Sequence, residues 1–364
     1  MNLASFSDSY AEARDKFLRA CEQRGLPVQS HIHPLKGRDQ EVLAIDVCRA
    51  GPSDARNLMV ISSGCHGVEG FCGSAIQIDL LGDERWVRCT EAPSLAVLYL
   101  HGLNPYGFSW IRRTTHENVD LNRNFLDFSR PLPDNPGYRA IDHLLLPRAW
   151  PAGIGQSARL MLFAARHGRQ ALQQAITRGQ HSHPDGLFFS GLEPTWSNLQ
   201  IRQILRQHAQ RCRRIGWIDI HTGLGPNGVG ERIYKGRASA ADLQRGQDWW
   251  GPQVTNSFDG SSTSAQLDGT LDLAVMQECP QAQYNGLTLE YGTLPGPQVL
   301  NALRAEQWLE CNPQASRTRH EQIKRQMRDA FYDNRTQWKQ QVLQQAREVC
   351  DLTLAALMEP FDPR

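Results

Sequence analysis

A histidine and a glutamate follow an apolar run near the start of the chain, at a spacing that suits a metal ion. The run Leu58–Ser62 leads into Gly64, and His66 and Glu69 come directly after it. Imidazole nitrogen and carboxylate oxygen are common zinc ligands, with bonds of about 2.0–2.2 Å. One tight turn can direct both side chains to the same point, so the pair is a candidate half of a zinc site. A polar surface loop is the alternative interpretation.

A second apolar run offers the missing ligand. Ile215–His221 ends in a histidine, and a glycine-rich loop follows it, as in the first segment. The carboxyl ends of strands in an open α/β sheet are where binding sites gather. Catalytic zinc keeps three protein ligands and one open position. His66, Glu69 and His221 are therefore predicted to bind a single Zn²⁺ ion, although a histidine at a strand end can also be purely structural.

Two further segments carry side chains that suit amide hydrolysis. The segment from Trp110 to Phe125 is rich in arginine and asparagine, which can grip a carboxylate, although it could also be a solvated loop. Glu290 lies inside the apolar run Leu287–Tyr291, where a carboxylate is costly to bury unless it is paired or functional. A glutamate beside a metal-activated water is a general base for hydrolysis. A strand-edge glutamate that faces water is the other interpretation.

Together these residues resemble the zinc carboxypeptidase (carboxypeptidase A-like) family, in a bacterial branch known mainly as a domain of unknown function. The order and approximate spacing of the motifs match from about residue 55 to 295, and the flanking segments extend the resemblance over nearly the full chain. The matching motifs, in chain order, are His66 and Glu69, Asn104-Pro105, Asp120-Leu121-Asn122-Arg123-Asn124, His221 and Glu290.

The resemblance implies a role for each matching residue. Asp120 would orient His66, and Glu290 would activate the water and then protonate the leaving amine. Arg112 would polarise the scissile carbonyl, with Arg113 as the alternative because the alignment is uncertain by one place. The residues that would hold the terminal carboxylate of the substrate are Asn122 and Arg123.

The implied activity is a zinc-dependent hydrolase that cleaves an amide bond next to a free carboxylate. The substrate would be a small peptide, because the insertion between residues 130 and 200 could roof the cleft. An N-acyl amino acid deacylase of the aspartoacylase type is the alternative within enzymes. A catalytically silent zinc- or ligand-binding module is the alternative from another class.

The elements expected around the site alternate between strand and helix. Continuous apolar runs are typical of strands buried on both faces of a parallel sheet, so we expect a three-layer α/β/α domain with a mixed, largely parallel twisted sheet. The predicted strands are Val42–Val47, Leu58–Ser62, Ala96–His101, Ile215–His221 and Leu287–Tyr291.

Helices are predicted from apolar periodicity and from capping residues. The whole chain, 1–364, is expected to be one domain with a helical insertion at 130–213 and an outer helix at 316–357. The predicted helices are one capped by Ser7 or Asp8 and ending at Gly25, and others at Gly70–Leu81, Ser157–Arg178 and Ser197–Arg213.

The composition excludes several partners. With 39 basic and 38 acidic residues, the net charge of +1 does not indicate binding to nucleic acid or to an anionic membrane. No apolar run approaches about 18 residues, and the N-terminus lacks the pattern of a secretory signal. The nine scattered cysteines favour reduced thiols in a cytoplasm. Among them, Cys65 is expected to be an apolar packing residue rather than a nucleophile.

Overall fold

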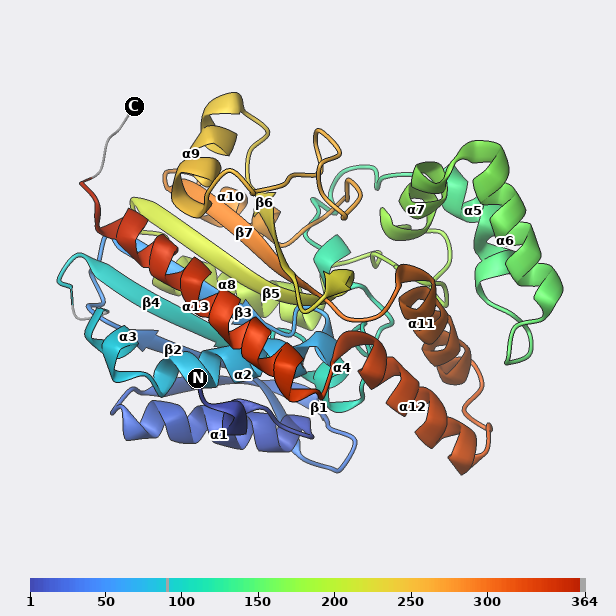
Figure 1. Cartoon of the computed structure of the whole chain (residues 1–364), viewed down its shortest axis with the longest axis horizontal. Helices are drawn as coiled ribbons and strands as arrows, with labels where there is room; N and C mark the ends of the chain where they lie inside the picture. Colours follow the sequence, from blue (N-terminus) through green and yellow to red (C-terminus); the bar gives the residue numbers. More distant parts are fainter. Residues whose placement is uncertain (90–91, 361–364) are drawn as a thin grey trace.

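A seven-stranded sheet runs through the centre of the computed structural model, which describes residues 1–89 and 92–360 (Figure 1). Its strand order is β1-β2-β4-β3-β5-β7-β6. The four central strands, which are parallel, are β4 (Leu95–His101), β3 (Asn57–Ser63), β5 (Arg214–Asn227) and β7 (Gln283–Gly292). The strands that pair antiparallel with their neighbours are β1 (Val28–Lys36), β2 (Val42–Ala50) and β6 (Gly230–Lys235). The mixed, largely parallel sheet predicted from the apolar runs is confirmed.

The two edge strands, β1 and β6, are not predicted by the sequence pattern. Each pairs on one side only, so its residues form no continuous apolar run. In β1 the buried residues are His31 and His33, and their neighbours in the strand are exposed. Pro34, which cannot donate a backbone hydrogen bond, is tolerated at such an edge.

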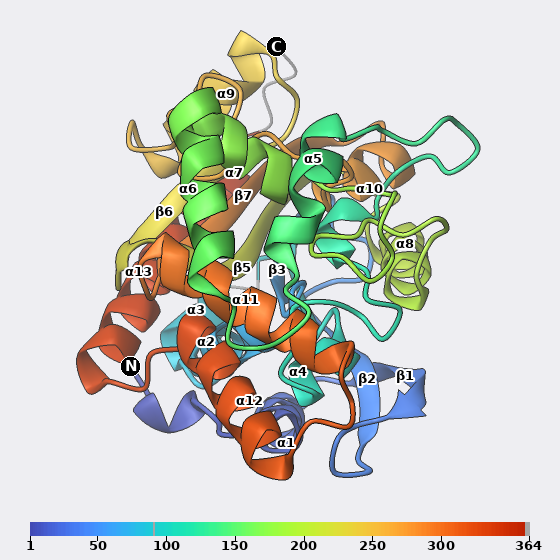
Figure 2. The ribbon, with the colours of Figure 1, turned by 90° about the vertical axis from the view of Figure 1, so that its right-hand side faces the viewer.

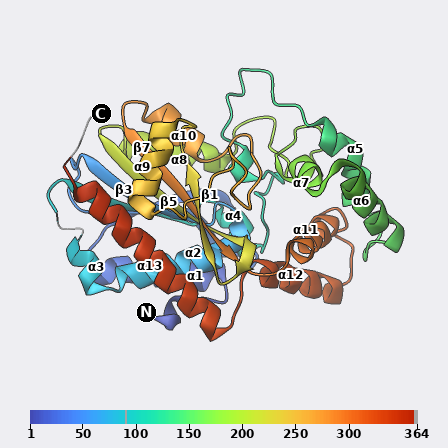
Figure 3. The same cartoon turned by 45° about the horizontal axis from the view of Figure 1, so that its top comes forward.

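Helices cover both faces of the sheet (Figure 3). Their apolar side chains form two large clusters, one on each face, and the strands contribute to both. This is the predicted three-layer α/β/α arrangement. One face is covered by α1 (Tyr10–Gln23), α2 (Gly70–Leu81), α9 (Ala240–Trp250) and α13 (Thr336–Met358), and the other by α8 (Trp196–His208) and α10 (Asp272–Glu278).

The first two helices lie close to where the sequence places them. Ser9 caps α1, not Ser7 or Asp8, and its Oγ accepts a hydrogen bond from the Glu12 backbone nitrogen at 3.1 Å. The predicted bounds of α2 agree with the structure. Other short elements are η1 (Leu3–Ser5), η2 (Gly67–Glu69), α3 (Glu84–Cys89), α4 (Pro105–Ser109) and η3 (Leu121–Arg123).

A group of helices gathers beyond one end of the sheet, as Figures 1 and 2 show. Their apolar side chains pack together and against Val68 of η2, so they cover the carboxyl end of β3. The group consists of α5 (Pro136–Leu145), α6 (Ile154–His167), α7 (Arg169–Thr177), α11 (Gly296–Glu310) and α12 (Arg317–Phe331).

Two long helices expected from the sequence are each divided. The prediction of one helix over Ser157–Arg178 is wrong, because Gly168 adopts a φ of 91° and separates α6 from α7. The stretch 316–357 holds α12 and α13, with residues 332–335 between them. Within the described ranges, no helix has both the length and the apolarity needed to cross a membrane.

Candidate metal centre

The turn after β3 holds the first two candidate ligands. Gly64 bends the chain with a φ of 68°, a conformation that favours glycine. Gly67 packs so closely on Gly107 that an added Cβ would lie 2.0 Å from the Gly107 carbonyl carbon. The bend brings His66 Nδ1 to 2.8 Å from Glu69 Oε1, and both side chains are buried. The bend of the backbone therefore brings the two side chains of this half of the site together.

The neighbouring strand β5 brings the third candidate ligand to the same point. His221 Nδ1 lies 3.2 Å from His66 Nδ1 and 3.1 Å from Glu69 Oε2. In a tetrahedral zinc site, bonds of about 2.0–2.1 Å place neighbouring ligand atoms roughly 3.3 Å apart. The three side chains therefore have both the spacing and the chemistry of a zinc site, and they fit the metal that the sequence predicts.

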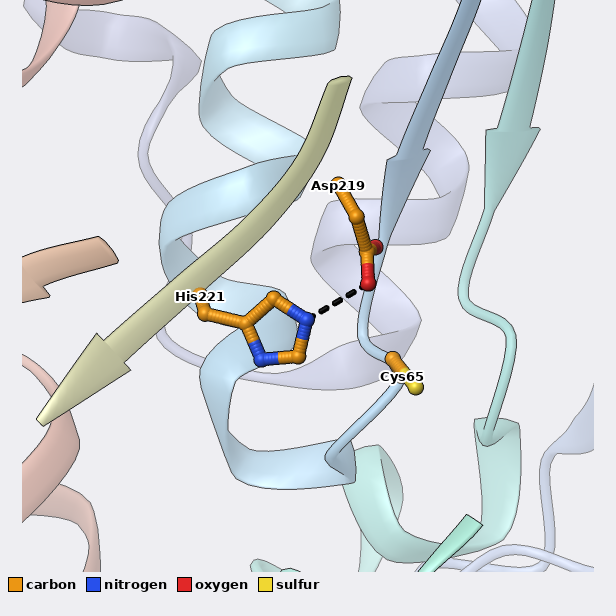
Figure 4. A group of neighbouring side chains, drawn as sticks. All are labelled: Cys65, Asp219 and His221. Atoms are coloured by element: carbon orange, nitrogen blue, oxygen red, sulfur yellow. Dashed lines mark hydrogen bonds and ion pairs between the residues drawn. The ribbon is translucent and has the colours of Figure 1, made fainter. Parts of the chain in front are cut away.

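On each histidine, the ring nitrogen on the side away from the proposed metal position lies beside a carboxylate. His66 Nε2 lies 3.2 Å from Asp120 Oδ1, and His221 Nε2 lies 2.5 Å from Asp219 Oδ2 (Figure 4). Such partners fix the orientation and tautomer of a metal-binding imidazole. No role for Asp219 is predicted from the sequence. The signal for it is the two-residue period of a strand, which places residues 219 and 221 on the same face.

A second group of potential ligands shares the same histidine. Figure 4 shows Cys65 beside Asp219 and His221, and these three side chains are also close enough to hold an ion. Burial, followed by the negative charge of Asp219, raises the pKa of the Cys65 thiol well above its ordinary value, so the metal-binding thiolate is disfavoured. Asp219 is already engaged, because Ser62 Oγ donates to its Oδ1 at 2.6 Å. The group with His66 and Glu69 therefore fits a cation better.

Arg113 reaches the candidate ligands from the loop that precedes η3. Its Nε donates to Asp120 Oδ2 at 2.9 Å, and its Nη1 donates to Glu69 Oε1 at 3.3 Å. Its Nη2 lies 2.7 Å from His66 Nε2. Burial opposes ionisation of Asp120, but Arg113, Arg123 and His66 outweigh it and hold the pKa of Asp120 well below its ordinary value. This carboxylate is therefore charged and fixed beside the site.

Arg112, the adjacent residue, points away from the candidate ligands. Its Nε lies 3.0 Å from Glu306 Oε1, and its Nη1 lies 3.1 Å from Glu310 Oε2. Its Nη2 donates to Asn118 Oδ1 at 3.1 Å. The residue first expected to polarise the carbonyl is thus engaged with α11, and its alternative, Arg113, lies at the ligands.

Two buried glutamates of the site have pKa shifts of opposite sign. Burial raises the pKa of Glu69, but His66 and His221 outweigh it and hold the pKa below its ordinary value. Glu290 pairs with His221 in the β5–β7 register, and burial, followed by the charge of Glu69, raises its pKa to about 8. The Leu224 backbone nitrogen donates to Glu290 Oε1 at 3.0 Å. Glu290 can therefore exchange a proton near neutral pH.

The two residues expected to hold a substrate carboxylate lie on η3, and both are buried. Asn122 Oδ1 accepts a hydrogen bond from the Leu271 backbone nitrogen at 2.9 Å. Arg123 donates from Nε to the Thr177 carbonyl and from Nη1 to the Asn122 carbonyl, both at 2.8 Å. Among the residues described, Asn122 Nδ2 and Arg123 Nη2 have no hydrogen-bond partner, so each has a donor left for a ligand.

The fold and the site together define an α/β protein with a candidate metal centre at the carboxyl ends of its parallel strands. The chain belongs to the family described as Protein of unknown function (DUF2817), whose model matches residues 6–345. This match confirms the predicted placement in a branch of unknown function. A search of curated proteins finds no match to the chain.

Solved structures similar to the chain include two carboxypeptidases and a fibrinolysis inhibitor. Carboxypeptidase A from Helicoverpa armigera is 14% identical, with 89% of this chain and 74% of that chain covered and a TM-score of 0.42. Bovine thrombin-activatable fibrinolysis inhibitor, in complex with tick carboxypeptidase inhibitor, is 12% identical, with 93% and 98% covered and a TM-score of 0.44. A metallo-carboxypeptidase from Burkholderia cenocepacia is 11% identical, with 89% and 68% covered and a TM-score of 0.40.

Proposed function

We propose that this chain is a zinc-dependent hydrolase that cleaves an amide bond next to a free carboxylate. The main support for the proposal is that the potential metal-ligand atoms of His66, Glu69 and His221 all lie within 4.8 Å of one another. When bound there, zinc supplies a Lewis acid for the scissile carbonyl and for a water molecule. The ordered resemblance of the motifs to carboxypeptidase A-like enzymes supports the same reaction.

Glu290 is the proposed general base. It accepts a proton from the attacking water and then gives that proton to the leaving nitrogen. Its place opposite His221 supports this role, as does a pKa that burial and Glu69 raise to about 8. A base with a pKa near the working pH is the most effective, because it both accepts and returns a proton readily.

Arg113 is proposed to stabilise the negative oxygen that forms as the carbonyl is attacked. Its guanidinium is already fixed by Asp120 and Glu69, so little reorganisation is needed during the reaction. Asn122 and Arg123 are proposed to hold the free carboxylate of the substrate through their remaining donors.

The helices that cover the site favour a small substrate over a large one. The apolar cluster that joins α5, α7, α11 and α12 includes Val68, which lies between the candidate ligands His66 and Glu69. A dipeptide or an N-acyl amino acid is therefore a better candidate than a folded protein chain.

A substrate panel tests the proposal directly. The full chain is loaded with zinc and offered dipeptides, N-acyl amino acids and the same compounds with an amidated carboxyl end. We expect hydrolysis only where that carboxylate is free. A clear preference for N-acyl amino acids would identify a deacylase. A chain that holds one zinc ion and hydrolyses nothing in the panel would be a binding module instead.

A further inference from the structure

A single phenylalanine, Phe188, lies against two of the arginines of the candidate site. Its ring centroid is 5.1 Å from the guanidinium carbon of Arg113 and 5.9 Å from that of Arg123. The residue is 6% exposed, so water reaches these contacts poorly. A guanidinium within about 6 Å of a ring centroid is attracted by the negative face of the ring, more strongly where water is excluded. One side chain thus contacts both cations that the proposed reaction uses to bind negative oxygens.

The backbone of Phe188 adopts a conformation that bulky residues avoid. Its φ is 54°, in the left-handed region that favours glycine. Such strain persists only where the surrounding structure holds it, and strained residues cluster at functional sites. The strain lowers the stability of the fold, so the position of the ring indicates a role beyond the filling of space.

Backbone hydrogen bonds hold the strained residue and its neighbour in place. The Gln180 backbone nitrogen donates to the Phe188 carbonyl at 3.2 Å. The Asp120 backbone nitrogen donates to the Phe189 carbonyl at 2.7 Å. The side chain of Asp120 also accepts a hydrogen bond from Arg113 Nε at 2.9 Å. The segment that carries the ring is therefore attached to the same residue that orients Arg113.

The two arginines are like charges in a buried place, and the ring offsets part of their repulsion. Burial lowers the pKa of Arg123, the charge of Asp120 opposes this effect, and the like charge of Arg113 adds to it. A second carboxylate could stabilise both cations, but it would occupy their N–H donors. The face of an aromatic ring attracts a guanidinium and leaves the donors in the guanidinium plane available for a substrate.

We propose that Phe188 is a positioning residue, whose ring holds the guanidinium groups of Arg113 and Arg123 in the geometry that binds negative oxygens. Through Arg113 it supports the oxyanion that forms during the reaction. Through Arg123 it supports the binding of the terminal carboxylate of the substrate. The inference rests on the proposed function, because the roles of both arginines are taken from it. Loss of the ring should therefore impair both turnover and substrate binding.

Fluorinated phenylalanines placed at residue 188 test the ring directly. Successive ring fluorines weaken the negative face and change the size of the side chain very little. The zinc-loaded full chain is assayed with the dipeptide that it cleaves best. We expect kcat/KM to fall stepwise with each fluorine, by about 3- to 30-fold over the series, with a lower kcat and a higher KM. A purely structural role would reduce only the amount of folded enzyme, so kcat would fall and KM would stay the same.

Phe188→Leu provides a second variant, and Phe189→Leu is its matched control. Leucine can keep the apolar packing of residue 188 with the cluster of the covering helices, but it has no aromatic face. Phe189 is 5% exposed, close to the 6% of Phe188, and its replacement leaves the Phe188 ring in place. We expect Phe188→Leu to reproduce the loss caused by the fluorinated rings, and Phe189→Leu to keep both kinetic constants.

A probe without a cleavable bond separates this proposal from the proposed reaction. Hexanoate carries a free carboxylate, and hexanamide is its uncharged counterpart. By calorimetry we expect hexanoate to bind the zinc-loaded full chain more tightly, and Phe188→Leu to weaken that binding by about 3- to 30-fold. This result without hydrolysis of any substrate would reject the proposed reaction and retain the role of Phe188. The role is overturned if the two probes bind equally, if KM stays the same over the fluorinated series, or if Phe188→Leu changes neither the kinetic constants nor the affinity for hexanoate.

Discussion

The two halves of the candidate metal centre are held in place by different means. His66 and Glu69 lie in a tight turn that glycine packing fixes. Arg113 forms charged hydrogen bonds with Glu69 and with Asp120, the carboxylate beside His66. His221 and Glu290 are instead aligned by the β5–β7 register, and Glu290 accepts one backbone hydrogen bond. The first half keeps its glutamate charged, as a cation requires, whereas the second keeps its glutamate close to a proton-transfer pKa. Substitutions in the two halves should therefore impair different properties: turnover, zinc affinity or folding stability.

Loss of the base in the second half should give the largest effect on turnover. Glu290→Gln keeps the shape of the side chain but cannot accept a proton, so kcat should fall by about 10²–10⁴-fold. Zinc content should be unchanged, because Glu290 is not among the candidate ligands. Glu231→Gln, at the residue that pairs with Glu290 from β6, is the matched control and should retain turnover. Normal turnover in Glu290→Gln would remove Glu290 from its proposed role.

Substitution of the two adjacent arginines should separate a catalytic role from a structural role in the first half of the site. Arg113→Met should lower kcat/KM by about 10²–10³-fold, the cost of removing one preorganised donor from a developing oxyanion. Arg112→Met should instead lower the free energy of unfolding by roughly 3 kcal/mol, because it breaks a buried ion pair with Glu306. Kinetics and chemical denaturation of both variants provide the comparison. The reverse pattern would return the catalytic role to Arg112.

The carboxylates behind the two histidines should tune metal binding. Asp219→Asn keeps a hydrogen-bond partner for His221 but removes its charge, so zinc affinity should fall by about 10- to 100-fold. Asp120→Asn should weaken zinc binding too, and should also lower folding stability because it removes the charged partner of Arg113. Competition with a chelator measures affinity, and thermal unfolding measures stability. Unchanged zinc affinity in both variants would contradict this account of the histidines.

The last expected effect is a pH dependence of stability in metal-free protein. The pKa of Glu290 in the fold is about 8, above its ordinary value of 4.5, so the folded state holds a proton that the unfolded chain releases. The stabilisation is complete below pH 4.5 and is lost as the pH rises through 8. Glu290→Gln should remove this loss, which the two pKa values set at up to about 5 kcal/mol, as denaturation of chelator-treated protein would measure. An identical pH profile for both proteins would contradict the raised pKa.

Much of the fold follows from the sequence because its central strands are buried on both faces. Continuous apolar runs reveal β3, β4, β5 and β7, and the histidines and glutamates at their ends mark the sheet edge where the site lies. Edge strands lack this signal, so β1 and β6 are missed. The place of β6 in the sheet becomes clear only when its register with β7 is known.

The detail of the site depends on local geometry that spacing does not reveal. Arg112 and Arg113 are adjacent in sequence, and the structure sends one toward α11 and the other toward the ligands. Ile111, just before them, has a φ of 54°, an unusual conformation for a branched residue, so the direction of each side chain could not be predicted. Asp219 is different, because its place two residues before His221 in a strand was a usable signal.

Metal analysis of the purified chain is the decisive test of the candidate metal centre. We expect one zinc ion per chain in the unaltered protein and loss of that ion in His66→Ala, Glu69→Ala and His221→Ala. Far-ultraviolet circular dichroism should confirm that each variant is folded. Cys65→Ala should keep the ion, because Cys65 belongs to the less suitable group. If His221→Ala retains a full complement of zinc while folded, or if the unaltered protein binds no zinc, the three side chains do not form the metal centre.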